Sequence, residues 1–161
     1  MDRKKISLIL LGIFIVVAIF SAANLLLNDK STNTSENGTL EITDSKSNQT
    51  RNVSFEKSGE CLEVYDANTI WVYGVGKVQL IQVKIPEKND KNYSDAKKFT
   101  EEMCLGKVVY LDIDDANPKD KYDRTLAIVY VNGSDVNREL INRNLAEISY
   151  FEPSEFKKGE I

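Results

Sequence analysis

The stretch DKYDRTLAIVYVNG (120–133), followed by VNRELINRNLAEISY (136–150), carries the clearest fold signal in the sequence. Its uncharged centre, 126–131, is rich in aliphatic and β-branched residues and ends at an Asn-Gly pair, which predicts a strand that stops in a turn. Asp135 then precedes apolar residues spaced three or four apart, the pattern of a helix with an aspartate N-cap. The block therefore predicts a strand, a turn and a helix over 136–143.

Working outward, the preceding residues add further strand and helix signals. The predicted strands cover 61–65, 69–73, 78–83 and 108–113, and the predicted helix covers 94–104, with Ser94 as N-cap and Gly106 just beyond its end. Strands, a helix, strands and a second helix within about 100 residues predict a small α+β domain, or a barrel with attached helices. We place this domain at 53–161.

Composition excludes several kinds of chemistry. The chain has 161 residues, enough for one small core, and it contains no histidine and only two cysteines. Serine–histidine triads, histidine general bases and histidine-containing or four-cysteine zinc sites are therefore excluded. The net charge is −4, which argues against unspecific attraction to nucleic-acid backbones but leaves room for a local basic groove.

The N-terminus carries an uncharged run of 22 residues, 6–27, after Arg3, Lys4 and Lys5. As a helix this run would span about 33 Å, enough to cross the hydrocarbon core of a bilayer. The basic residues predict that the N-terminus is cytoplasmic and that the domain is extracellular, on a single-pass membrane protein. A cleavable signal peptide ending near Ala23, which would secrete the domain, is the alternative.

Residues 28–52 are rich in Ser, Thr, Asn and charge and show no apolar periodicity, so they are predicted to form a disordered linker. The sequence also contains six Asn-x-Ser/Thr motifs, which would permit glycosylation on export. They are at Asn33, Asn37, Asn48, Asn52, Asn92 and Asn132.

Four segments occur in the order and spacing of a known family. VYDANTIWV (64–72), VQLIQVKIPE (78–87) and EEMCLGK (101–107), followed by the block that ends at residue 150, resemble the staphylococcal nuclease-like family, the thermonucleases. The helix end and the early cysteine are similar to those of archaeal secreted or membrane-anchored members. The resemblance covers about 60–156 and implies an OB-fold, a five-stranded barrel with packed helices. Active members of this family are calcium-dependent phosphodiesterases that cut DNA and RNA.

The resemblance implies that two catalytic residues are retained. Glu87, after Pro86, occupies the position of the family's general base, and Arg124 that of its second arginine. Asp123 stands where the family usually has glycine, and if that glycine adopts a positive φ, aspartate is among the replacements that the backbone tolerates. The implied substrate contacts come from Tyr122, Lys121, Lys84 and Tyr150.

Other family positions are changed. Gln79 replaces the first arginine and offers only neutral hydrogen bonds to phosphate. Asn68 and Lys84 replace the two calcium-ligating carboxylates, and Ile85 replaces a threonine, so only the flanking Asp66 remains acidic. An ammonium about 4 Å from a divalent cation would be repelled by about 2–8 kcal/mol, depending on the effective dielectric constant. We therefore expect no metal site, with calcium as cofactor only if the family site still functions.

Simpler interpretations stay open for these residues. Glu87 would also fit a solvated turn, Arg124 a structural ion pair with a carboxylate such as Glu87, and Lys84 a surface strand position. The alternative for Lys84 is that its ammonium takes the place of calcium and binds phosphate or Glu87 without metal. The acidic run in 112–123 lacks the spacing of a calcium loop and is interpreted as a solvated loop.

Cys61 and Cys104 fall on a strand and a helix that pack together in the family's fold. Because the domain is expected outside the cell, we predict a disulfide between them, with two reduced core cysteines as the alternative.

The sequence thus predicts an externally displayed domain that is impaired in calcium-dependent hydrolysis and acts as a binding module. Its partner would be nucleic acid, another phosphorylated polymer or a surface protein. A weak or metal-independent nuclease that uses Glu87, Arg124 and Lys84 is the alternative, and a structural envelope domain is a third possibility.

Overall fold

The computed structural model describes residues 36–161, which form strands around one core with two helices. In chain order the elements are β1 (Glu36–Thr43), β2 (Thr50–Asp66), β3 (Thr69–Val72), β4 (Gly76–Leu80), β5 (Val83–Lys84), α2 (Tyr93–Cys104), β6 (Val108–Ile113), β7 (Thr125–Val131), β8 (Ser134–Asp135), α3 (Val136–Asn142) and β9 (Glu147–Ile148).

Five of these strands close into a barrel. β2 pairs with β3, β3 with β4, β4 with β7 and β7 with β6, and β6 returns to pair with β2. The β4–β7 pair is parallel, and the other four are antiparallel. With α2 connecting the third and fourth barrel strands, this order is that of the OB-fold, and it confirms the predicted barrel with packed helices.

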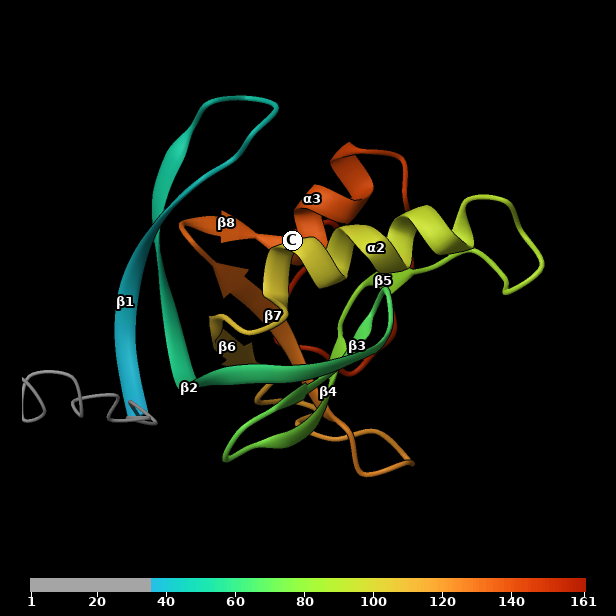
Figure 1. Cartoon of the computed structure of the whole chain (residues 1–161). Coiled ribbons are helices and arrows are strands. Elements are labelled where there is room, and N and C mark those ends of the chain that lie inside the picture. The colour runs from blue at the N-terminus through green and yellow to red at the C-terminus, as the bar shows by residue number, and fades with distance from the viewer. Residues whose placement is uncertain (1–35) are drawn as a thin grey trace, which may run out of the picture. The chain divides into compact units, whose positions relative to one another are not determined.

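The core lies inside the barrel and beneath α3 (Figure 1). β7 is its most buried strand because one face lines the barrel interior and α3 covers part of the other. Asn137 of α3 is fully buried, and its side chain accepts a hydrogen bond from the Val129 N–H (3.0 Å) and donates one to the Ile81 carbonyl (2.9 Å). These bonds fix α3 on the barrel and satisfy backbone groups that would otherwise be buried without partners.

The predicted strand 78–83 is interrupted at Gln82. This residue has a φ of 56°, so the extended backbone breaks and the segment forms β4 and β5. Its buried side chain accepts a hydrogen bond from the Gly159 N–H (2.7 Å) and donates one to the Lys157 carbonyl (2.9 Å). The break therefore positions the C-terminal segment against β5.

The helix boundaries agree closely with the prediction. α3 begins after Asp135, whose carboxylate accepts a hydrogen bond from the Arg138 N–H at 2.9 Å, as predicted for an N-cap. α2 begins at Tyr93, one residue earlier than expected. Its N-cap is Asn92 in place of Ser94, and the Asn92 side chain makes no capping bond.

The predicted disordered linker 28–52 differs from the structure over 36–52. β1 pairs with β2 in this segment, and Ile42 is 3% exposed although the surrounding residues are polar. The Thr43 N–H donates to the Gly133 carbonyl (2.8 Å), which attaches the β1–β2 hairpin to the β7–β8 turn. The segment is held in place by the burial of Ile42 and by its pairing with β2. Neither feature can be predicted from composition.

No helix within residues 36–161 is long and apolar enough to cross a membrane. The predicted anchor or signal segment, 1–27, and the first part of the linker lie outside the described residues.

The predicted disulfide is absent from the structure. Cys61 and Cys104 are both free thiols and both fully buried. The Sγ of Cys61 donates to the Glu63 carbonyl at 3.6 Å instead of bonding to Cys104. The prediction of a cystine was therefore wrong for this structure, and the alternative of two reduced core cysteines describes it.

Candidate functional site

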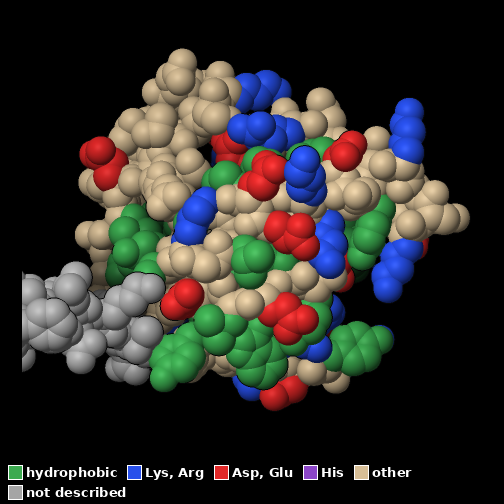
Figure 2. All heavy atoms as spheres, in the orientation of Figure 1, with side chains coloured by type: hydrophobic (Ala, Val, Ile, Leu, Met, Phe, Trp, Pro, Cys, Tyr) green, Lys and Arg blue, Asp and Glu red, His purple; other side chains and the backbone are tan. Residues whose placement is uncertain are grey.

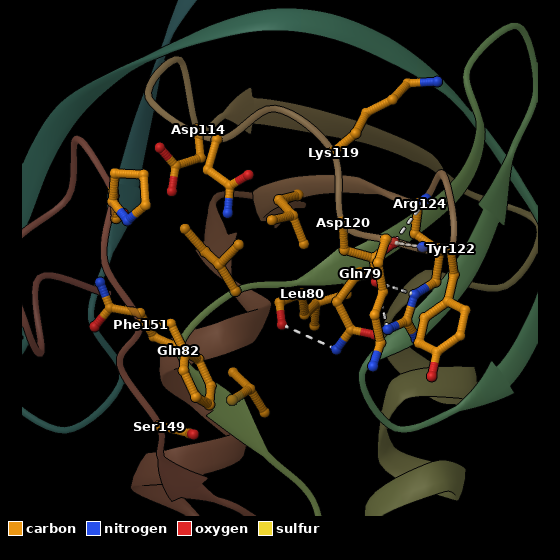
Figure 3. A pocket seen from close by; sticks show the side chains of 17 residues that line it. Gln79, Leu80, Gln82, Asp114, Lys119, Asp120, Tyr122, Arg124, Ser149 and Phe151 are labelled. Carbon is orange, nitrogen blue, oxygen red and sulfur yellow. Dashed lines mark hydrogen bonds and ion pairs between the residues drawn. The ribbon is translucent and has the colours of Figure 1, made fainter.

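A hollow with a volume of about 620 Å³ lies at one side of the barrel. It is bordered by 79–83, by the β6–β7 loop and by the segment after β9. In OB-folds this region, formed by the second and third strands and the loop between the fourth and fifth, binds oligonucleotides. Figure 3 shows Arg124 and Tyr122 on one side of the hollow and Phe151 and Ser149 on the other.

The β6–β7 loop is built around Asp120. One of its carboxylate oxygens accepts hydrogen bonds from the N–H groups of Tyr122 (2.9 Å) and Arg124 (3.0 Å). The other accepts from the Arg124 guanidinium, with Nε at 2.7 Å and Nη2 at 2.5 Å. Arg124 is therefore held in a two-point ion pair with Asp120, where the sequence suggested Glu87 as its partner.

The ion pair and the backbone hydrogen bonds lower the pKa of Asp120 more than partial burial raises it. Burial favours the protonated acid, but hydrogen bonds from the Arg124 side chain and from two backbone N–H groups favour the carboxylate. Together they hold the pKa of Asp120 below its ordinary value. The Arg124 side chain is still 26% exposed and lines the hollow, so the ion pair presents a positioned guanidinium to a ligand.

The tip of the loop displays an aromatic ring between cations. Tyr122 is 67% exposed, with the Nζ of Lys121 at 5.0 Å and the Cζ of Arg124 at 5.3 Å from its ring centroid. Asp123 has a φ of 63°, in the left-handed region that aspartate tolerates, and it pairs with Lys119 at 2.6 Å. The tight turn at Asp123 thus brings the exposed ring and the guanidinium to the same rim.

Gln79 lies on β4 inside the same hollow. Its side-chain oxygen accepts from the Thr69 hydroxyl at 3.1 Å, and its nitrogen lies 3.4 Å from the Leu80 carbonyl. The side chain is therefore engaged with the sheet. A phosphate in the hollow would meet one guanidinium, that of Arg124, and a neutral amide.

The opposite rim contains residues that the sequence analysis missed. Phe151 is 76% exposed and lines the hollow together with Ser149, whereas the predicted Tyr150 between them is half-buried and is not part of the lining. Two adjacent aromatic residues, Tyr150 and Phe151, were the sequence signal that could have indicated a ring at this rim. The irregular backbone after β9 decides which of the two rings faces the hollow.

Glu87 and Lys84 line a second, smaller hollow of about 380 Å³, together with Ile85. Both charged side chains are exposed, while Ile85 packs against the edge of the core. Val83 lines the first hollow and Lys84 the second, so β5 borders both. The structure therefore places Arg124 and Glu87 in different hollows.

The residues at the family's metal positions do not fit calcium. Asn68 donates its side-chain N–H to the Val83 carbonyl (2.9 Å), and its oxygen lies near the Thr69 hydroxyl (3.3 Å). Asp66 accepts from the Asn68 backbone N–H (3.1 Å), which makes it part of a turn. Within residues 36–161 no three acidic or cysteine side chains are grouped as a metal site. Because calcium requires several oxygen ligands, this donor set with a lysine beside it does not provide a site.

The acidic run after β6 has a structural role in this fold. Asp114 is 3% exposed, and its carboxylate accepts hydrogen bonds from the N–H groups of Ala116 (3.2 Å) and Glu155 (3.0 Å). The interpretation as a solvated loop is therefore wrong for Asp114, which fastens the C-terminal segment to the loop.

Five of the six predicted glycosylation motifs lie in the described residues, and all five asparagines are exposed. Asn33 lies outside the described residues. Glycosylation itself stays a prediction.

Comparison with known proteins finds relatives of the family that the sequence resembles. The family model described as "Staphylococcal nuclease homologue" matches residues 77–161, more than half of the chain. The chain is 33% identical over 110 residues to the SPbeta prophage-derived endonuclease YokF of Bacillus subtilis (strain 168), a match that covers 59% of this chain and 37% of that protein. It is 34% identical over 99 residues to Endonuclease YncB of the same organism, covering 55% of this chain and 47% of that protein.

The matches thus span less than half the length of either relative. The matched family region contains the whole rim built by Tyr122, Arg124 and Phe151, and it begins on β4, just before Gln79. With this coverage, the barrel topology and the loop geometry together, the chain belongs to the staphylococcal nuclease homologue family.

Proposed function

We propose that this domain is a binding module for single-stranded nucleic acid, with little or no calcium-dependent hydrolysis of phosphodiesters. The observation that carries the proposal is the rim of the larger hollow, where a fixed guanidinium adjoins the exposed ring of Tyr122 and the exposed ring of Phe151 lies on the opposite side. Guanidinium groups bind phosphate through charge-assisted hydrogen bonds, and exposed aromatic rings stack with unpaired bases.

The changed family positions support binding over cleavage. Hydrolysis requires stabilisation of the negative charge that develops on phosphorus, which the family achieves with two arginines and a cation. Here Gln79 is hydrogen-bonded to Thr69, and Asn68 donates to the Val83 carbonyl. Arg124 keeps its place, so affinity for phosphate is retained while most of the charge stabilisation is lost.

The first test is binding of a fluorescent single-stranded oligonucleotide to the full chain in the presence of a chelator. Arg124→Ala is expected to weaken binding at least about tenfold, the loss of a charge-assisted hydrogen bond. Tyr122→Ala and Phe151→Ala are each expected to weaken it about fivefold or more, through lost stacking. Lys98→Ala, on the exposed side of α2, removes one positive charge elsewhere and is the matched control.

Equal weakening by Arg124→Ala and Lys98→Ala would show that binding follows net charge alone and would contradict the proposal. Binding of a phosphorylated polymer without bases, as strongly as the oligonucleotide, would reassign the ligand to phosphate chains in general. Absence of any binding by a folded sample would leave the surface-protein or structural role.

The second test is calcium dependence. We expect no turnover of single-stranded DNA with either calcium or chelator, and no shift of Tm on adding calcium. Restoring the family residues by Gln79→Arg, Asn68→Asp, Lys84→Asp and Ile85→Thr is expected to produce both effects. Calcium-stimulated turnover of the unmodified chain would show that Asn68 and main-chain oxygens suffice for the metal.

A weak, metal-independent nuclease is the second candidate. It is favoured by the similarity to two proteins named as endonucleases, and by the hollow that Glu87 and Lys84 share. In this case Glu87 would take a proton from the attacking water, and Lys84 would supply charge in place of the cation. Slow hydrolysis in chelator that is abolished by Glu87→Gln would support it.

We further propose that the domain is held at the outer face of a membrane by residues 6–27. The support is the length of this uncharged run and the basic residues before it. The expected result is that the full chain floats with lipid vesicles after an alkaline carbonate wash. Recovery of a chain shortened near residue 23 from the culture medium would favour the secreted alternative.

A further inference from the structure

One face of the barrel exposes apolar and aromatic side chains that have no role in either hollow. Five residues make up this apolar face, each between 40% and 49% exposed. They are Leu62, Trp71, Tyr73, Leu105 and Val108. Isolated exposed apolar residues are normal in proteins, but a contiguous group marks an interaction surface.

Backbone pairing places the five residues around one segment of β2. Val108 of β6 lies opposite Glu60 of β2, and the Tyr73 N–H donates to the Glu60 carbonyl at 2.8 Å. Leu105 forms a bridge with Cys61, the residue before Leu62. Trp71 lies opposite Glu63, so all five residues adjoin β2 residues 60–63. In Figure 2 hydrophobic side chains gather over this part of β2.

The apolar face lies next to the start of β1. Glu36, the first residue of β1, pairs with Lys57 of β2. Lys57 is three residues from Glu60, a separation of about 10 Å along a strand. Only eight residues, 28–35, separate Glu36 from the uncharged run 6–27. Fully extended, they span at most about 28 Å, so an anchored domain stays within that distance of the bilayer.

We propose that the apolar face rests on the lipid bilayer surface and orients the domain on it. This inference rests on the proposed anchoring by residues 6–27. Tryptophan and tyrosine favour the interface between hydrocarbon and water, where Trp71 and Tyr73 would lie, and the three aliphatic side chains would enter the edge of the acyl region. The side chains of the apolar face would then contact lipid in place of water.

The charges around the face exclude electrostatic attraction as the driving force. Glu60, Glu63, Lys77 and Lys107 border it, two acidic and two basic residues, so it has no excess of positive charge. Anionic lipid is therefore expected to add nothing to the contact, in contrast to polybasic membrane-binding segments. A neutral phosphatidylcholine bilayer is the appropriate partner.

The molecule provides its own probe, because Trp71 is its single tryptophan. The test uses the full chain with phosphatidylcholine vesicles, with and without lipids brominated on their acyl chains, which quench a tryptophan that touches them. We expect brominated lipid to reduce Trp71 emission about twofold or more. The acrylamide quenching constant should fall by a similar factor relative to the Leu62→Ser, Val108→Thr double variant, which weakens the contact.

Ile148→Thr is the matched control, because Ile148 is also an exposed strand residue, 45% exposed, but lies on β9. It should behave as the unmodified chain. Because all three substituted positions are exposed, the variants should fold, which far-UV circular dichroism verifies.

Vesicle flotation separates the two proposals. A chain that floats after carbonate washing but shows no lipid quenching of Trp71 keeps the anchor and overturns the apolar face as a membrane contact. Quenching without carbonate-resistant flotation keeps the contact and overturns the anchor, and absence of both results overturns both. Equal quenching in the unmodified chain and the double variant would also contradict the contact.

Discussion

At the scale of single residues, the ion pair of Arg124 with Asp120 shapes the candidate site. Asp120 accepts three hydrogen bonds, two from backbone N–H groups and one from the guanidinium, whose Nη2 also contacts the carboxylate as an ion pair. It therefore both folds the loop and holds Arg124 at the rim. Asp120 is a positioning residue, and a ligand would touch Arg124.

Asp120→Ala is expected to lower the free energy of unfolding by about 1–3 kcal/mol, because backbone and guanidinium donors lose a partly buried acceptor. Urea unfolding measures this loss. Asp115→Ala is the control, since the Asp115 side chain is exposed, and a change within about 0.5 kcal/mol is expected. If the two variants lose equal stability, the loop does not depend on Asp120.

At the scale of elements, the β1–β2 hairpin is fastened to α3 by two ion pairs. Arg51 lies 3.4 Å from Asp135, the N-cap of α3, and Asp44 lies 3.5 Å from Arg138. Asp135 is 5% exposed, whereas the Arg51 side chain is 43% exposed, so only the carboxylate end of the pair is shielded from water. Removing the partner of a buried carboxylate costs more than breaking a pair on an open surface, because the buried charge is left without compensation.

Arg51→Ala is expected to destabilise the domain by about 1–3 kcal/mol and to speed amide exchange in β1, because buried Asp135 loses a partner. Hydrogen exchange resolved by mass spectrometry follows the β1 peptide. Lys98→Ala, which breaks an exposed pair with Glu102, should cost no more than about 0.5 kcal/mol. Unchanged exchange in β1 would show that strand pairing alone holds the hairpin.

The contact of α2 with β2 buries both thiols. Burial raises the pKa of Cys61 to about 11 and that of Cys104 to about 12, so neither is a thiolate at neutral pH. Iodoacetamide at about pH 8 is therefore expected to modify neither residue in the folded reduced protein and to modify both in urea. Modification of the folded protein at the rate seen in urea would show that the contact opens readily.

At the scale of the whole molecule, the half-buried Asp112 and the buried Asp135 couple folding to the binding of protons. Burial, and next the charge of Glu56, raises the pKa of Asp112 to about 7. Burial raises the pKa of Asp135 to about 6, although the Arg138 N–H and the Arg51 charge oppose this. Both values exceed the ordinary 3.8, so the folded state binds more protons than the unfolded chain between about pH 4 and 7.

The free energy of unfolding should therefore fall as pH rises through that window. Urea midpoints measured at about pH 5 and 8 test this, and Asp112→Asn should reduce the difference between them. Asp90→Asn, at an exposed loop position, should leave the difference unchanged. If the midpoint of the unmodified chain rises with pH over the window, the two acids do not dominate its stability.

Several features of the site follow from local sequence. The left-handed residue at Asp123, the N-cap at Asp135 and the strand before it are set by short-range sterics and hydrogen bonding. The ring that lines the hollow is a different case, because Tyr150 was expected and Phe151 is found. In an irregular segment, packing against the backbone on either side decides which of two adjacent side chains faces the hollow.

The sequence by itself indicated a small domain of strands with two helices, because the β and helix periodicities and the turn residues act over a few positions. The OB barrel, and the prediction that Asn68 and Lys84 stand at metal-ligating positions, came from the resemblance to the staphylococcal nuclease-like family. Only the tertiary structure decided that Arg124 pairs with Asp120 and not Glu87, that 36–52 forms a hairpin, and that Cys61 and Cys104 remain thiols. These outcomes depend on distances between residues far apart in the chain, which packing of the whole barrel sets.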